Sequence, residues 1–188
     1  VIKKASEVWD GGYAMGGMVG QGDGFLLRDP NGIRPAYYYV DDEVAVVASE
    51  RPVIQTAFGL TFDQVKEVPP GHMVWIRKNG DLSIEKILTP KERLACSFER
   101  IYFSRGNDGD IYKERIELGR RLTHRVMEAS GGNFDHTVFS FIPNTAEISY
   151  MGLVQGAEDL LNELKAKAII GLGKSPKEKD VMDIMMQR

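Results

Sequence analysis

The first half of the chain alternates short apolar runs with tight polar turns, a pattern typical of antiparallel strands. Asn79-Gly80 favours a two-residue hairpin, and Asp41-Asp42 lies between two apolar runs where a hairpin turn is expected. We expect Ser49-Glu50 to cap the N-terminus of a short helix that ends at Phe58. Six apolar runs predict strands, at residues 24–28, 36–40, 44–48, 62–67, 73–77 and 82–87.

The pattern changes after Lys91, where longer helical repeats begin. The run Phe98–Ser104 predicts one more strand, and apolar residues at helical spacing predict helices at 111–129 and 146–165. Short apolar runs predict strands at 136–142 and 168–171. A strand, a helix and a second strand in this order are typical of a parallel α/β unit. We therefore expect a strand-rich domain followed by an α/β domain, with the boundary between Phe103 and Phe134.

One predicted turn, Arg28–Pro35 (RDPNGIRP), carries more charge than a hairpin requires. Pro30 presets one turn dihedral, and Gly32 tolerates the left-handed backbone region. Pro35 forces the preceding Arg34 into an extended conformation, so this arginine is held in place. Two arginines and an aspartate on one rigid turn predict either a binding site or a salt-bridged brace of the sheet.

Composition narrows the class of protein. With 188 residues, of which 43% are hydrophobic and 27% charged, the chain can bury a hydrophobic core without disulfides or bound metal ions. A net charge of −3 predicts neither a nucleic-acid partner nor an anionic membrane partner. Cys96 is the only cysteine, which excludes an intrachain disulfide and fits a cytoplasmic protein. We expect neither a signal peptide nor a membrane span, since no apolar run of the sequence reaches membrane-spanning length.

Motifs for other chemistries are incomplete. Gly171–Ser175 resembles the end of a phosphate-binding loop, but Ala168 stands where that pattern requires glycine, so a simple loop is expected. The histidines at 72, 124 and 136 are far apart and lack the spacing of metal ligands. Cys96 has no histidine near it in sequence, which favours an inert, small apolar residue over a nucleophile.

Three segments, taken together, carry a family resemblance. The turn Arg28–Pro35, the pair Ser49-Glu50 and the segment Cys96–Arg105 (CSFERIYFSR) follow one another at long, specific spacings. This order resembles the amidophosphoribosyltransferases (glutamine phosphoribosylpyrophosphate amidotransferases), where an arginine-rich turn, Ala-Ser-Glu, a Pro-Gly turn and Cys-x-Phe-Glu-x-x-Tyr-Phe-x-Arg succeed one another. The resemblance covers Gly11 to Leu122 and becomes weaker beyond.

The resemblance implies two domains of different architecture. The first is an N-terminal-nucleophile glutaminase (an αββα sandwich of two antiparallel sheets between helices), and the second is a phosphoribosyltransferase with a parallel sheet. Residues 1–105 are then expected to be part of a class II glutamine amidotransferase domain, and residues 106–133 a connecting loop and helix. Residues 134–188 are expected to begin the transferase-like domain, with Phe139–Pro143 as its first core strand.

The resemblance also implies an activity. Enzymes of this family hydrolyse glutamine and transfer the ammonia to phosphoribosyl diphosphate, which gives phosphoribosylamine for purine synthesis. Their nucleophile is a cysteine at the mature N-terminus, whereas this chain starts with Val1 and Cys96 is internal. The diphosphate-binding loop is expected downstream of Arg188. We therefore expect a fragment without catalytic, cofactor or metal-binding residues of its own, inactive alone, from a parent that is a homo-oligomer.

The resemblance further implies cofactors for the parent and possible roles for two groups of residues. Magnesium is expected in the parent, and some members hold an iron–sulfur cluster with one ligand at Cys96; four ligands are required, so the cluster remains undecided. Ammonia must pass between the two sites without meeting water. The candidates for coupling at this junction are Tyr102, Phe103, Ser104 and Arg105. The candidates for the structural turn are Arg28, Asp29, Asn31, Gly32, Arg34, Ser49 and Glu50.

Two alternatives stay open. Asparagine synthetases share the glutaminase fold, a similar arginine-containing turn and Ala-Ser-Glu, but are not expected to continue with Phe-Glu-x-x-Tyr-Phe-x-Arg and a helix. The second alternative is a non-catalytic, amidotransferase-like interaction module that kept the sheets and lost the nucleophile.

Overall fold

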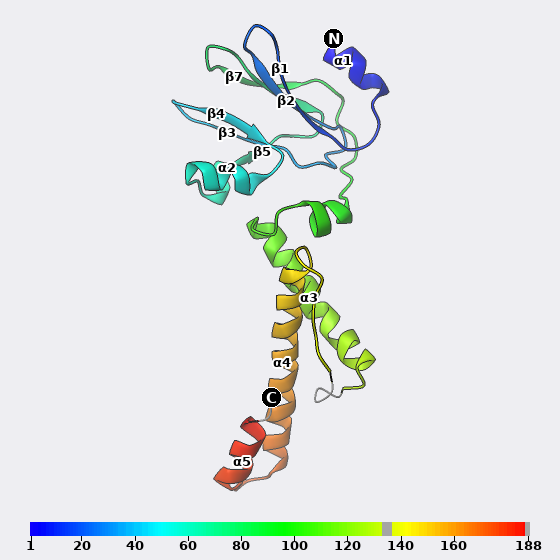
Figure 1. Cartoon of the computed structure of the whole chain (residues 1–188), viewed down its shortest axis with the longest axis vertical. Helices are drawn as coiled ribbons and strands as arrows, with labels where there is room; N and C mark the ends of the chain where they lie inside the picture. Colours follow the sequence, from blue (N-terminus) through cyan, green and yellow to red (C-terminus); the bar gives the residue numbers. More distant parts are fainter. Residues whose placement is uncertain (133–136, 187–188) are drawn as a thin grey trace. The chain divides into compact units, whose positions relative to one another are not determined.

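The computed structural model describes residues 1–132 and 137–186. The chain divides into two compact units, Val1–Ile111 and Tyr112–Arg188 (Figure 1). His136 and Phe134, which appear in the predicted strand and the predicted boundary, lie outside the described residues. The predicted division into residues 1–105, 106–133 and 134–188 stays a prediction.

Two antiparallel sheets form the first unit, after a short helix α1 (Ile2–Ala5) and a 3-10 turn (Ser6–Val8). The larger sheet has the order β1-β2-β6-β7, with β1 at Ala14–Met18, β2 at Gly24–Arg28, β6 at His72–Ile76 and β7 at Leu82–Lys86. The smaller sheet has the order β4-β3-β5, with β3 at Tyr37–Val40, β4 at Ala45–Ala48 and β5 at Lys66–Glu67.

The core of this unit is built from apolar residues of both sheets and their connections. Leu26 of β2 and Val74 of β6 are buried with Ala36 and Val68, which precede β3 and follow β5. Helix α2 (Arg51–Phe58) lies against the smaller sheet and buries Ile54 (Figure 1). Gly59 ends this helix in the left-handed conformation, which glycine adopts without steric cost.

The structure confirms most of the predicted strands and hairpins. The strands expected at 24–28, 36–40, 44–48, 73–77 and 82–87 are present, each within one residue at either end. Asp41-Asp42 is a hairpin turn, because the Asp41 carboxylate accepts hydrogen bonds from the backbone N–H groups of Glu43 and Val44 at 2.8 Å. The strand expected at 62–67 is partly wrong, because a capping box at Thr61 turns Phe62–Gln64 into a 3-10 helix and leaves only β5.

The predicted strand Phe98–Ser104 is wrong. Residues Glu99–Phe103 form a single turn of π-helix, η3, in which the Ser104 N–H donates to the Glu99 carbonyl at 2.7 Å. The aromatic run favoured a strand, but neither of the two sheets includes this segment. The Glu99 side chain is instead buried against Arg34, which fixes the segment as a local turn.

The described part of the second unit holds α3 (Gly109–Ala129), whose first three residues belong to the first unit, together with α4 (Glu147–Gly171) and α5 (Glu178–Met185). The two long predicted helices are therefore confirmed. The strand expected at 168–171 is wrong, because the apolar run continues α4 with no helix breaker before Gly171. Residues 137–142, the described part of the other predicted strand, have no regular structure. The described part of this unit thus shows no opening of a parallel sheet.

Glycines allow α3 and α4 to approach closely. A Cβ atom on Gly119 would lie 1.8 Å from the Ser149 carbonyl oxygen, and one on Gly152 would lie 2.0 Å from the Ile116 carbonyl oxygen. The Thr123 hydroxyl donates to the Gly119 carbonyl at 3.4 Å, within the same interface. Backbone-to-backbone packing of this kind excludes any larger side chain.

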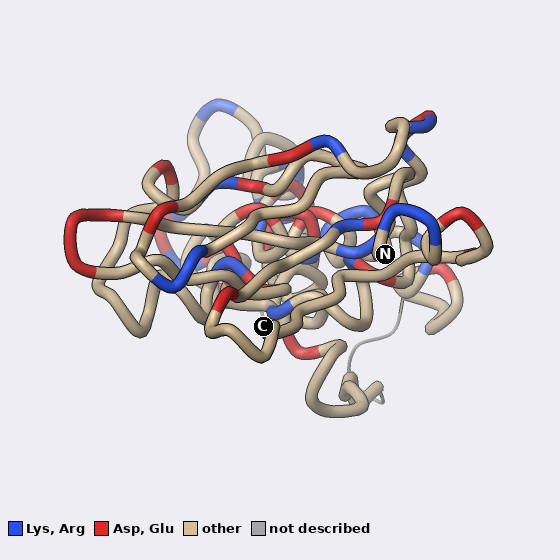
Figure 2. The backbone as a smooth tube through the Cα atoms, turned by 90° about the horizontal axis from the view of Figure 1, so that it is seen from above, with Lys and Arg blue, Asp and Glu red and all other residues tan. Residues whose placement is uncertain are grey.

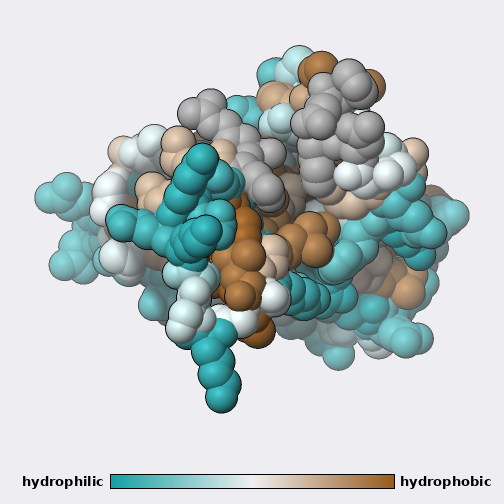
Figure 3. Space-filling view, turned by 90° about the horizontal axis from the view of Figure 1, so that it is seen from below, coloured by the Kyte–Doolittle hydropathy of each residue, from teal (hydrophilic) through white to brown (hydrophobic). Residues whose placement is uncertain are grey.

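Charged and apolar residues are mixed over the surface. Figure 2 shows lysine and arginine interspersed with aspartate and glutamate along the backbone, in keeping with the small net charge. The face drawn in Figure 3 has apolar surface bordered by hydrophilic side chains. Within residues 1–132 and 137–186, no helix has both the length and the apolar composition needed to cross a membrane.

Candidate functional site

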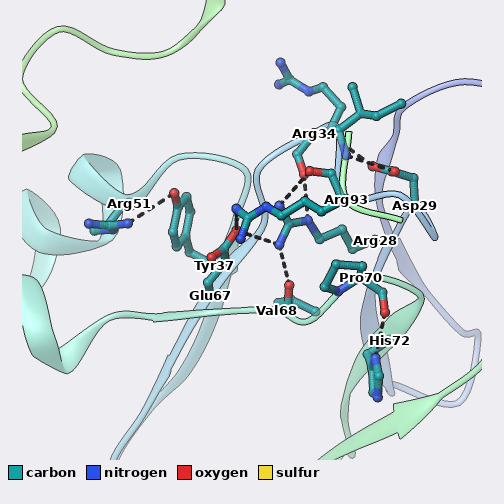
Figure 4. A network of polar contacts seen from close by, with 12 residues as sticks. Arg28, Asp29, Arg34, Tyr37, Arg51, Glu67, Val68, Pro70, His72 and Arg93 are labelled. Atoms are coloured by element: carbon teal, nitrogen blue, oxygen red, sulfur yellow. Dashed lines mark hydrogen bonds and ion pairs between the residues drawn. The ribbon is translucent and has the colours of Figure 1, made fainter. Parts of the chain in front are cut away.

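The guanidinium of Arg28 is the centre of the polar network in the first unit (Figure 4). Its side chain is 2% exposed and lies at the end of β2. It donates to three backbone carbonyls, those of Arg34 (2.7 Å), Val68 (2.6 Å) and Gly32 (3.0 Å). One Nη atom also lies 2.7 Å from the Glu67 carboxylate. A buried cation with this many acceptors joins the turn to the strand β5 and the segment that follows it.

Asp29 closes the same turn from within. Its carboxylate is fully buried and accepts three backbone N–H groups, those of Asn31, Ile33 and Arg34, each at 3.0 Å. Gly32 has φ +62°, and a Cβ there would lie 2.8 Å from Pro70, so the turn requires glycine at this position. The carboxylate therefore fixes the backbone path of the turn.

Three further contacts tie the turn, and the Glu67 carboxylate paired with Arg28, to distant segments. Arg34 binds the Glu99 carboxylate of η3 through both oxygens, at 2.7 and 2.5 Å, across 65 residues of sequence. Glu67, which forms an ion pair with Arg28, also accepts a hydrogen bond from Arg93 at 3.0 Å. The Asn31 side-chain amide donates to the Glu92 carbonyl at 2.9 Å. Segments 66–68, 92–93 and 99 thus meet at one turn.

A cavity of about 150 Å³ lies beside this turn, within the first unit. It is mostly polar, and its walls include the turn, the start of α2 and the segment that leads into α3. The charged residues of the wall are Arg28, Glu50, Arg51, Glu67, Arg93, Glu99, Arg100, Asp108 and Asp110.

Glu50 joins this wall and does not cap its helix. It is the N-cap of α2 but makes no capping hydrogen bond with its side chain, so the start of the helix is confirmed and the side-chain cap is wrong. Its carboxylate instead faces the Arg105 N–H at 3.5 Å. Burial raises the pKa of Glu50, and the Arg105 N–H and the Arg34 guanidinium oppose this effect. Ser49, the other predicted residue, precedes it and is half-buried.

The four candidates for coupling lie in different environments. Ser104 lines the cavity, and the Arg105 N–H faces Glu50. Tyr102 and Phe103 pack against each other and against Phe98, but they are 59% and 58% exposed and do not line the cavity. The structure therefore places Ser104 in the cavity wall beside the Arg28–Pro35 turn and Arg105 against Glu50, which belongs to the same wall.

Four site residues were missing from the sequence-based candidates: Glu67, Glu99, Arg51 and Asp108. Each contacts its partner across a long stretch of chain, which no local pattern reveals. For Glu99 the sequence offered one signal, an acidic residue within the aromatic run 98–103, which is unusual. In the structure this side chain is 6% exposed, and a buried acidic side chain usually has a charged partner.

The described donor groups do not gather into a metal site. Among the described residues, no group of three or more histidine, cysteine, aspartate or glutamate side chains is arranged to hold a metal ion. Cys96 is a free, half-buried thiol in the cavity wall. The described residues therefore do not fit magnesium or an iron–sulfur cluster by themselves, and we assign no chemical step to either.

Two antiparallel sheets, packed through an apolar core and covered on one side by α2, are consistent with part of a class II glutamine amidotransferase domain. Residues 2–95, half of the chain, match the family model described as "Glutamine amidotransferases class-II", and the chain belongs to this family. Within the family, the chain is related to amidophosphoribosyltransferases.

The relatives are distant and considerably longer. The chain is 32% identical to the amidophosphoribosyltransferase of Schizosaccharomyces pombe over 171 residues, covering 79% of the chain and 31% of the relative. It is 28% identical to that of Pseudomonas aeruginosa over 141 residues, covering 71% and 27%. The chain thus spans less than a third of the length of these curated relatives.

Solved structures agree with this assignment. The glutamine phosphoribosylpyrophosphate amidotransferase from Bacillus subtilis, complexed with ADP and GMP, matches with a TM-score of 0.63 and 26% identity, over 84% of this chain and 33% of that one. A structure entitled "Structure of the allosteric regulatory enzyme of purine biosynthesis" matches with the same TM-score and 28% identity, over 82% and 32%.

Proposed function

We propose that this chain is the segment of a glutamine phosphoribosyl pyrophosphate amidotransferase that links the glutaminase to the phosphoribosyltransferase. The whole enzyme would hydrolyse glutamine and transfer the ammonia to phosphoribosyl diphosphate in the cytoplasm. The proposal is supported by relatives that match 71% to 79% of the chain, well beyond the family match that ends at residue 95. A match of this extent favours an amidophosphoribosyltransferase over an asparagine synthetase.

The observation that carries the proposal is the pair between Arg34 and Glu99. It ties the turn of the glutaminase domain to η3, the segment in which Tyr102 and Phe103 lie. A carboxylate buried to this degree is costly unless it is paired, so the two segments hold one another in place. We assign to Tyr102, Phe103, Ser104 and Arg105 the role of coupling the two activities.

In this proposal residues 134–188 would begin the transferase part, and the parent would be a homo-oligomer that uses magnesium. The chain alone would be inactive. A glutaminase of this class requires a cysteine at the mature N-terminus, and Cys96, the only cysteine, is internal.

The test compares the full-length gene product with the 188-residue chain. The full-length protein should release glutamate and pyrophosphate in a one-to-one ratio when given glutamine and phosphoribosyl diphosphate, and the chain alone should release neither. Pyrophosphate release that requires no glutamine, or glutamate release by the chain that Cys96→Ala abolishes, would contradict the proposal.

A further inference from the structure

The side chain of Arg51, the first residue of α2, is held rigidly in the cavity wall. Its guanidinium carbon lies 3.7 Å from the centre of the Phe62 ring and 4.8 Å from that of Tyr37. Its Nη2 group donates to the Tyr37 hydroxyl at 3.3 Å (Figure 4). Contacts between a guanidinium and two aromatic rings orient the plane of the cation, and the side chain is only 11% exposed.

The other edge of this guanidinium is buried and incompletely paired. Nε and Nη1 make no hydrogen bond within the part of the chain that the structure describes. They face two carboxylates, with 3.6 Å from Nε to Asp108 Oδ2 and 3.6 Å from Nη1 to Asp110 Oδ2. These distances are beyond hydrogen-bond length but too short for an intervening water, so the edge acts on these carboxylates directly.

Asp108 also binds the backbone at the start of α3. It is 5% exposed, and its other oxygen, Oδ1, accepts the N–H groups of Asp110 (3.0 Å) and Ile111 (3.4 Å). These are N–H groups of the first turn of α3, which need an acceptor from outside the helix. One buried carboxylate therefore links the Arg51 edge to the place where the loop 104–108 becomes a helix.

We propose that Arg51 is a positioning residue that holds the segment Ser104–Asp110 through Asp108 and thereby sets how efficiently ammonia from glutamine is used. The inference rests on the coupling role proposed above. It adds a residue outside the candidate segments, on a helix of the glutaminase domain. A guanidinium locked by two rings presents a fixed edge, and the charge of that edge attracts the segment that carries Ser104 and Arg105.

The first readout is amide hydrogen exchange in the full-length protein. Arg51→Met keeps the apolar stem and removes the charged edge, and it should raise the exchange of the Asp110 and Ile111 amides about tenfold. Arg77→Met is the matched control, since Arg77 is half-exposed and pairs only loosely, at 3.9 Å, with Glu85; it should leave both amides unchanged. Unchanged exchange in Arg51→Met would overturn the positioning role.

The second readout is the ratio of glutamine-dependent to ammonia-dependent product formation. Arg51→Met should lower this ratio about fivefold, because a displaced junction loses ammonia but does not alter the transferase chemistry. A merely structural role would lower both activities together and leave the ratio constant, which would overturn the inference. Asp108→Asn, which leaves the ring contacts of Arg51 in place, should shift the ratio in the same direction if Arg51→Met does not fold.

Failure of the proposed function is recognised separately. A wild-type protein that forms no phosphoribosylamine from glutamine would disprove the enzyme assignment and the coupling role with it. Normal wild-type activity with an unchanged ratio in both variants would disprove the role of Arg51 alone.

Discussion

Replacing Arg28 with methionine tests whether the Arg28–Pro35 turn braces the sheets. The substitution retains an apolar stem and removes every donor. Three carbonyls, those of Gly32, Arg34 and Val68, lose the Arg28 donor, while the Glu67 carboxylate keeps Arg93. An unsatisfied buried acceptor costs about 1–3 kcal/mol, and the loss of Arg28 from Glu67, which is 35% exposed, adds at most about 1 kcal/mol. Because such contributions are not additive, we expect a loss of about 4 kcal/mol in the free energy of unfolding.

The assay is urea unfolding followed by tryptophan fluorescence. Trp75 of β6 stacks on Phe25 of β2, with ring centres 6.1 Å apart, and reports on the sheet that Arg28 ends. A loss of about 4 kcal/mol is a large fraction of the 5–15 kcal/mol typical of a domain. If the methionine variant does not fold, Arg28→Lys replaces it in the test. This variant retains the charge and some donors, so its loss in the free energy of unfolding should be about half as large.

Arg93→Met is the matched control, because Arg93 contacts the same Glu67 from a position that is 61% exposed. Its loss should stay below about 1 kcal/mol. A loss below about 1 kcal/mol for Arg28→Met as well, with an unchanged dependence on urea, would refute the brace.

Three other changes have defined outcomes. Gly119→Ala should destabilise the helical unit by about 3 kcal/mol in thermal unfolding followed by circular dichroism, because its Cβ would meet the Ser149 carbonyl. Gly171→Ala is the control and should cause no such loss, because the space around Gly171 is open; equal effects of the two substitutions would contradict the close packing. Burial raises the pKa of Glu50, so the folded chain binds more protons than the unfolded chain, and the stability contributed by protonated Glu50 is lost as pH rises through the raised value. The free energy of unfolding of Glu50→Gln should therefore rise relative to that of the wild type from about pH 4 to 7, with Glu85→Gln as control. A difference in free energy that stays constant with pH would contradict burial of the Glu50 carboxyl. Tyr102→Ala in the full-length protein should reduce glutamine-dependent activity more than ammonia-dependent activity, whereas equal losses would count against coupling.

The strands and hairpins were largely predictable because local signals determine them. Gly24–Arg28 was bounded correctly from its apolar run, and Asn79-Gly80 marked the β6–β7 hairpin, where Gly80 has φ +91°. The helical structure of segment 168–171 was not predictable, since four apolar residues fit a buried strand as well as the end of a helix. Only the continuity of α4 decides between them.

Only the turn residues of the site could be predicted from the sequence, and their partners could not. The crowded charges of Arg28, Asp29 and Arg34 pointed to this turn, but their partners lie elsewhere in the chain. Arg34 and Glu99 are 65 residues apart, and Arg28 and the Val68 carbonyl are 40 apart. Such contacts depend on how the two sheets pack, which hydrophobic periodicity does not encode.

We propose that nitrogen passes from glutamine to the phosphoribosyl group within the full-length protein. The most direct test of this transfer gives the full-length gene product glutamine labelled with ¹⁵N in the side-chain amide, phosphoribosyl diphosphate and an excess of unlabelled ammonium, and measures ¹⁵N in the phosphoribosylamine formed. We expect the product to retain most of the label, because the ammonia would not mix with solvent. A product whose label is diluted to the level of the free ammonium, or no product at all, would contradict the proposal.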